Sequence, residues 1–163
     1  MRPVRGNAGS TDAIAVLTED HRRMRSLFEE FEALPPAAYV RKSKIAAQMI
    51  DVITVHAFIA REVLYPRLTS LLPEVEPELD YLHDQHRRAE QIAVELWTMR
   101  PEDERFTPSA AALIDQLRIH LGTQERAWFP RIVEELEPST LDALGAELIR
   151  ARRRAPASPR TNG

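Results

Sequence analysis

Cysteine is absent from this chain of 163 residues. Disulfide bonds, thiolate metal sites and thiol nucleophiles are therefore excluded. Glycine is scarce as well: five glycines stand against twelve prolines, a balance that favours helices joined by proline-containing turns over a β fold. No uninterrupted run of about 18 apolar residues occurs, so we expect no helix to span a membrane.

A strong excess of charge of one sign is also missing. The formal net charge is −3, which gives no electrostatic basis for binding nucleic acid or an anionic membrane. The basic run at residues 150–154 is interpreted as a solvated helix end. Residues 1–11 contain two arginines but no apolar signal-peptide core. We therefore expect a cytoplasmic protein that is a monomer or a weak homo-oligomer.

What the sequence does contain is helical periodicity. Apolar residues recur every three or four positions in four long segments. Pro66 lies inside the second segment and predicts a kink there. Ser10 or Thr11 is expected to cap the first helix, and Thr107 the fourth. The expected helices are a first that ends at Pro35-Pro36, a second from about Ala37, a third from about Glu78 to Met99, a fourth with Pro108 at its first position, and a short fifth from Ser139 or Thr140.

Four amphipathic helices with short connections predict an all-α fold, an up-down-up-down four-helix bundle over residues 11–137. A short C-terminal fifth helix is expected over residues 138–154. The composition of the two ends predicts disorder over residues 1–10 and 155–163.

A duplication runs through the four helices. The stretch HAFIAREVLYPR begins at His56, and HLGTQERAWFPR begins 64 positions later at His120. DHRRM contains His21, and QHRRA contains His86, 65 positions later. The sequence therefore indicates two helical hairpins of one design, each with a histidine on both helices.

Four of the five histidines fall on predicted inner faces, one on each helix of the bundle. A single histidine on an apolar face is usually a buried residue with one hydrogen-bond partner. Four imidazoles buried together leave several donors and acceptors in need of partners. A metal ion satisfies them together, and imidazole nitrogen suits Fe, Zn, Cu or Ni.

These motifs resemble those of haemerythrin-like proteins with the HHE cation-binding domain. The resemblance covers about Ala13 to Leu136 and rests on DH, H-x5-E-V-L-Y-P, QH and H-x4-E-x3-F-P in successive helices. It implies a non-haem iron centre of one or two ions inside a four-helix bundle. The imidazole ligands that it implies are His21, His56, His86 and His120.

The chain departs from the family at the bridging carboxylates. Family members usually carry H-x3-E twice, because residues i and i+4 share a helix face and both reach the metal. Here those two positions are Ala60 and Gln124. Two cations in a core of low dielectric repel strongly unless anionic bridges lie between them. The centre is therefore expected to be mononuclear or an altered dinuclear one.

Other residues are possible replacements for the missing carboxylates. Glu125 is preferred, because the oxygen-carrying haemerythrins that the chain resembles use a carboxylate five residues after this histidine; a surface role is the alternative. Glu90, four residues after His86, can share its face or lie at a helix boundary. Gln124 offers a neutral amide oxygen. His83 is about 60° round its helix from His86. It could support the centre or act as a substitute ligand, but an exposed or capping role is preferred.

Three functions are consistent with these observations. The first is a metal-binding protein that handles O2, NO or peroxide, or that senses or stores iron. The second is a metal-free member of the family that serves as a structural or partner-binding module; loss of both glutamates favours it and retention of four histidines opposes it. The third is a redox enzyme with catalase-like or oxidase-like activity, which is the weakest because no substrate pocket or catalytic residue is specified.

Overall fold

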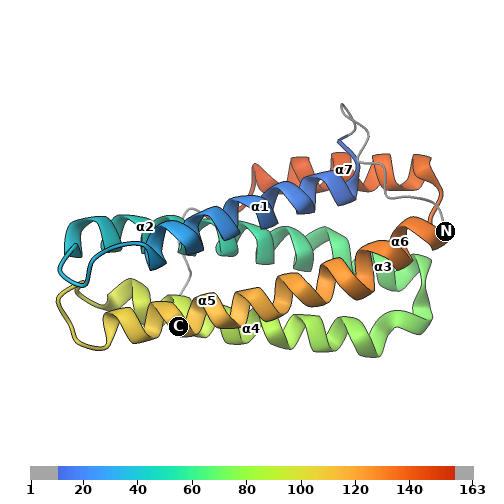
Figure 1. Ribbon diagram of the computed structural model, residues 1–163. Coiled ribbons are helices and arrows are strands. Elements are labelled where there is room, and N and C mark those ends of the chain that lie inside the picture. The colour runs from blue at the N-terminus through green and yellow to red at the C-terminus, as the bar shows by residue number, and fades with distance from the viewer. Residues whose placement is uncertain (1–10, 157–163) are drawn as a thin grey trace.

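Four helical rods lie side by side in the computed structural model, which describes residues 11–156 (Figure 1). The turns at residues 33–38 and 99–105 lie at the same end of the molecule (Figure 1). No strand occurs in the described part of the chain, so the predicted all-α bundle is confirmed. The elements are α1 (Ala13–Glu32), α2 (Tyr39–Ile59), η1 (Ala60–Leu64), α3 (Tyr65–Leu71), η2 (Pro73–Val75), α4 (Glu76–Thr98), α5 (Phe106–Thr123), η3 (Gln124–Trp128), α6 (Phe129–Glu135) and α7 (Pro138–Arg152).

The second and fourth rods are each built from three consecutive elements. The second rod runs through α2, η1 and α3, and the fourth through α5, η3 and α6. α1 and α4 form the other two rods of the bundle, and α7 packs along the outside of α1 (Figure 1). The predicted C-terminal helix is present, and residues 1–10 and 157–163 lie outside the described part.

The helix starts differ from the predicted ones. Asp12 caps α1, because its extended backbone lets its carboxylate accept the backbone N–H of Ala15 at 2.8 Å. α5 begins at Phe106, so the hydroxyl of Thr107 is not a cap and instead accepts a hydrogen bond from Lys42 Nζ at 3.1 Å. α7 begins at Pro138, whose missing N–H costs nothing in a first helical turn.

The second and fourth rods each carry a single π-helical turn just before an internal proline, Pro66 and Pro130. The backbone N–H of Tyr65 bonds to the carbonyl of Ala60, and that of Phe129 bonds to Gln124, each five residues back. Proline offers no N–H, and its ring would meet the carbonyl four residues earlier. The predicted kink at Pro66 is therefore accommodated by one extra residue in the turn, and the same solution recurs in the second hairpin.

A layer of buried polar residues divides the apolar core into two clusters. One cluster lies around η1, α3, α6 and α7, and the other around the far halves of α1, α2, α4 and α5. The core therefore places the histidines between two dry regions. The polar side chains that are at most 7% exposed are Asp20, His21, Lys42, Thr54, His56, Gln85, His86, His120 and Gln124.

The second rod, Tyr39–Leu71, is long and apolar enough by length and composition to cross a membrane. Sequence inspection missed it because charged residues such as Asp51 interrupt the apolar run. In its most apolar window 61% of the residues are buried inside the bundle. Its apolar character is accounted for by the core to which it contributes.

α7 approaches α1 so closely that only glycine fits at the crossing point. A Cβ atom on Gly145 would lie 2.2 Å from the carbonyl oxygen of Thr11 and 2.8 Å from the backbone nitrogen of Ala13. Both are backbone atoms, which cannot move aside as a side chain can. The docking of α7 on the start of α1 therefore depends on Gly145.

We expect Gly145→Ala to lower the free energy of unfolding by about 1–3 kcal/mol, because the added methyl group overpacks a backbone contact. Denaturant unfolding of the purified variant measures this change. The matched control is Gly122→Ala, where the added Cβ would meet only the end of the flexible Arg126 side chain. A control variant as destabilised as Gly145→Ala would contradict this account.

Candidate metal centre

Three histidines from three different rods meet in the polar layer. His56 comes from α2, His86 from α4 and His120 from α5, and none has any exposed surface. One ligand nitrogen from each lies within 4.8 Å of the other two. We call these residues the histidine trio. Among the described residues they form a group able to hold a single metal ion.

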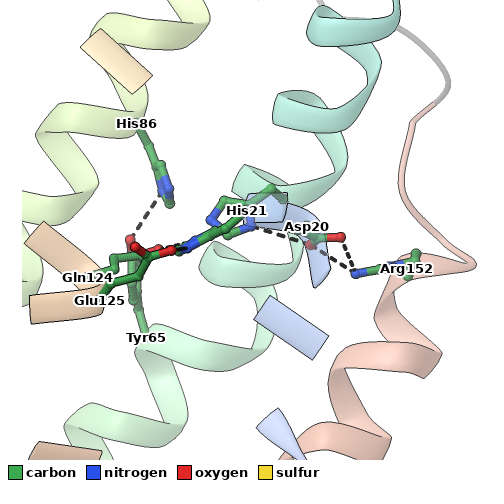
Figure 2. A network of polar contacts seen from close by, with 8 residues as sticks. Asp20, His21, Tyr65, His86, Gln124, Glu125 and Arg152 are labelled. Carbon is green, nitrogen blue, oxygen red and sulfur yellow. Dashed lines mark hydrogen bonds and ion pairs between the residues drawn. The ribbon is translucent and has the colours of Figure 1, made fainter. Parts of the chain in front are cut away.

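The two ring nitrogens of each trio member have different surroundings. Each Nδ1 atom has an oxygen partner, whereas each Nε2 atom is buried with no hydrogen-bond partner among the described residues. A proton on Nδ1 leaves the Nε2 lone pair free, which is the tautomer that a metal ion requires. The Nδ1 partners are Asp20 Oδ2 for His56 (3.4 Å), the Tyr65 hydroxyl for His86 (3.2 Å; Figure 2) and Gln85 Oε1 for His120 (3.0 Å).

His21, the fourth predicted ligand, lies next to the trio but is already bonded. Its ring centroid is 5.3 Å from that of His56. Its Nε2 lies 2.9 Å from the amide oxygen of Gln124, and its Nδ1 lies 3.0 Å from a carboxylate oxygen of Glu125 (Figure 2). Both nitrogens thus face side-chain oxygens, so His21 stands apart from the trio, whose Nε2 atoms have no partner in the described part of the chain.

The preferred carboxylate, Glu125, faces an arginine rather than the trio. Arg25 donates to both of its oxygens, at 2.6 and 2.8 Å. This pairing, chiefly the hydrogen bond from Arg25, holds the pKa of Glu125 below its usual value. Glu125 therefore acts here as a link between His21 and Arg25.

The three further residues considered as ligands also lie outside the trio. Both oxygens of Glu90 accept from Arg61 at 2.7 Å. Gln124 is buried against His21. His83 is half-buried and lines an open cleft of about 480 Å³ beside Tyr65. The structure therefore brings together three of the predicted ligands and gives the others different partners.

Burial favours the neutral form of His21, His86 and His120. Desolvation is the main reason why the pKa values of His86 and His120 lie well below the usual 6.5. The same effect lowers the pKa of His21 to about 4. A neutral imidazole has the lone pair that binds a metal, so burial holds His86 and His120 in the binding form at neutral pH.

The residues that orient the trio follow the internal duplication. Asp20 precedes His21 in the chain and contacts His56; Gln85 precedes His86 and contacts His120. In each hairpin, then, the residue before the first histidine supports a histidine on another rod, His56 in the first and His120 in the second. Sequence analysis missed this role, although the repeated dipeptides DH and QH were its signal.

The aromatic residues before the two prolines also correspond. Tyr65 stacks on His86, with ring centroids 5.7 Å apart, and Phe129 stacks on His21 at 5.3 Å. Only the tyrosine carries a hydroxyl that can reach the ring nitrogen. Phe129 has no hydroxyl, and the Nδ1 of His21 contacts Glu125 instead. The Nδ1 atoms of His86 and His21 therefore have different kinds of partner.

Two ion pairs of opposite polarity flank the polar layer. Arg25 on α1 pairs with Glu125 on η3, and Glu90 on α4 pairs with Arg61 on η1. Arg25 and Glu90 each follow a histidine by four residues, and Arg61 and Glu125 each follow one by five. In these two pairs, the first hairpin supplies both positive charges and the second both negative charges.

Comparison with known proteins agrees with the fold. The model of the haemerythrin HHE cation-binding domain matches residues 12–132. A solved structure, "Hemerythrin HHE cation binding domain-containing protein: Rv2633c homolog from Mycobacterium kansasii", is similar with a TM-score of 0.72 and 17% identity, covering 88% of this chain and 86% of that one. No curated protein matches significantly. The family match extends over most of the chain, through all four rods and every histidine of the layer, and the chain therefore belongs to the haemerythrin HHE cation-binding family.

Proposed function

We propose that this protein binds one metal ion through the Nε2 atoms of the histidine trio. The observation that carries the proposal is the set of three buried Nε2 atoms that have no partner among the described residues. An unsatisfied buried polar atom costs about 1–3 kcal/mol. Three such histidines, with ligand atoms within 4.8 Å of one another, form a costly cluster that one cation would satisfy.

The donor set supports one ion rather than a carboxylate-bridged pair. Ala60, at one bridging position of the family, is fully buried and offers no ligand atom. Gln124, at the other, is neutral and contacts His21. Glu125 has its charge balanced by Arg25. Two adjacent cations would lack the anions that reduce their repulsion, whereas a single ion has no neighbouring cation to repel it.

Iron is the metal that we propose, as the family relationship implies. Imidazole nitrogen is a suitable ligand for iron, and three protein ligands leave coordination positions open. Bound ferrous iron would supply such an open position to O2, NO or peroxide. The protein's own contribution is to hold three rings in fixed orientations and to keep them dry between two apolar clusters.

We further propose that the protein works in the cytoplasm as a monomer or weak homo-oligomer, without nucleic acid or membrane as a partner. The small net charge supports the absence of nucleic acid as a partner. The burial of the apolar second rod in the core supports the absence of a membrane partner.

A metal-free structural or partner-binding module is the second possibility. It is favoured by the absence of a bridging carboxylate at Ala60 and Gln124 and by the pairing of Glu125 with Arg25. Such a module would keep the trio as a relic and would have the same stability with and without metal.

Metal analysis of the purified protein separates these functions. We expect close to one iron per chain after anaerobic loading with Fe²⁺, and a rise in melting temperature that grows with metal concentration, because a ligand that binds only the folded state stabilises it. Two irons per chain would contradict the mononuclear centre. No bound iron, together with an unchanged melting temperature, would favour the metal-free module.

A further inference from the structure

The C-terminal helix reaches the polar layer through one side chain. Arg152, the last residue of α7, donates from Nη2 to both carboxylate oxygens of Asp20, each at 2.9 Å (Figure 2). The Asp20 side chain is only 10% exposed. The Nε of Arg152 is buried without a hydrogen-bond partner in the described structure. The guanidinium is therefore held against Asp20 by Nη2 and not by Nε.

The same carboxylate is the Nδ1 partner of His56. Oδ2 of Asp20 lies 3.4 Å from His56 Nδ1 and 2.9 Å from Arg152 Nη2. The polar contacts therefore run without a break from α7 through α1 to a member of the trio. A carboxylate beyond the ligand ring fixes its tautomer and raises its basicity, and losing such a partner typically costs about 10- to 100-fold in metal affinity.

Two other contacts, neither of which involves Asp20, also dock α7 on the bundle. Gly145 brings its backbone against the start of α1. Glu147 pairs with Arg67 of α3 at 3.4 Å, in a contact that leads to no histidine. Of these two ion pairs of α7, the one formed by Arg152 touches the chain of contacts to His56, and the one formed by Glu147 does not.

We propose that Arg152 is a positioning residue of the metal centre and that α7 docking and metal binding are coupled through Arg152, Asp20 and His56. This inference rests on the proposed function. Arg152 holds the Asp20 carboxylate against Nδ1 of His56. This contact keeps the Nε2 of His56 turned toward the other two members of the trio. Coupling between two sites is reciprocal, so the bound ion also strengthens the docking of α7. The helix then reports metal occupancy at the protein surface.

The test compares Arg152→Ala with the matched control Glu147→Gln, using Zn²⁺ as a redox-inert probe. We expect Arg152→Ala to raise the Kd for Zn²⁺, measured by calorimetry, about tenfold or more. Glu147→Gln should keep the wild-type Kd although it removes the other ion pair of α7. Arg152→Lys, which keeps the charge on a shorter side chain, should give an intermediate Kd and serves as the test variant if the alanine variant does not fold.

Two further measurements separate positioning from a general loss of stability. The visible spectrum of bound Co²⁺ should change in Arg152→Ala and stay unchanged in Glu147→Gln. Amide exchange in α7 should slow when Zn²⁺ binds to the wild-type protein, but not in Arg152→Ala. A wild-type Kd in both Arg152 variants would overturn this inference and leave the proposed function intact. A wild-type protein that binds no Zn²⁺ or Fe²⁺ would overturn both.

Discussion

His120→Ala should abolish stoichiometric metal binding. The side chain supplies one of three buried Nε2 atoms, and the ring is held in place by Gln85 at 3.0 Å. With two histidines remaining, the ion would have too few protein ligands to compete with water. We expect metal occupancy after iron loading to fall from about one per chain to near zero, as measured by elemental analysis. His56→Ala should behave in the same way.

Two other histidine variants sharpen this experiment. His83→Ala changes a half-buried residue outside the trio and should leave occupancy unchanged. His21→Ala tests the set of four ligands predicted from the sequence, because the two nitrogens of His21 face Gln124 and Glu125 in the structure. Occupancy near one in His21→Ala supports a three-histidine site, and its loss would show that the fourth ring joins the ion. Unchanged metal occupancy in His120→Ala would show that the histidine trio is not the metal site.

Restoring the two missing carboxylates should change the number of ions. We expect the double variant Ala60→Glu and Gln124→Glu to bind close to two irons per chain. The added charges would reduce the repulsion between neighbouring cations. Without metal, the same charges would lie in a region where Ala60 and Gln124 are at most 2% exposed. Burying unpaired charge is strongly unfavourable, so the metal-free double variant should be less stable by roughly 3–5 kcal/mol.

The signature of this variant is therefore stability that depends on metal. Its melting temperature should rise on iron loading by more than that of the wild-type protein, and elemental analysis should give the count. The small change Ala60→Ser with Gln124 retained is a control that adds a polar group without charge. A double variant that folds and still binds one ion or none would show that the carboxylates are not what limits the count.

The fold and the meeting of the histidines could be predicted from sequence because both depend on local periodicity. Helical spacing places His56, His86 and His120 on inner faces, and the 64- and 65-residue repeat places them at one level of two matched hairpins. Helical spacing is a short-range regularity, the repeat matches the two hairpins to each other, and packing preserves both. The family relationship, confirmed over residues 12–132, rests on the same motifs.

The partners of the site residues were beyond prediction because they lie on other helices. Glu125 is the preferred carboxylate by its distance from His120 along the chain, but Arg25, a hundred positions earlier, bonds to both of its oxygens. Nothing near Arg25 in the sequence marks it as that partner. The link from Arg152 to Asp20 spans 132 positions and depends on how α7 docks. Which nitrogen of a ring stays free is decided by such distant contacts.

Helix geometry also differs from the ideal that sequence reasoning assumes. An ideal α-helix turns Glu125 about 140° away from His120. The π-helical turn at Gln124–Trp128 adds a residue just there and rotates the side chains after it relative to those before it. Pro130 follows this turn, but spacing alone does not reveal its effect on the turn.

The arrangement of the two flanking ion pairs adds a charge preference to the association of the two hairpins. Arg25 and Arg61 belong to the first hairpin, and Glu90 and Glu125 to the second. Two copies of the first hairpin would set arginine against arginine at both flanks, and two copies of the second would set glutamate against glutamate. The charge pattern therefore favours pairing of unlike halves over pairing of identical ones.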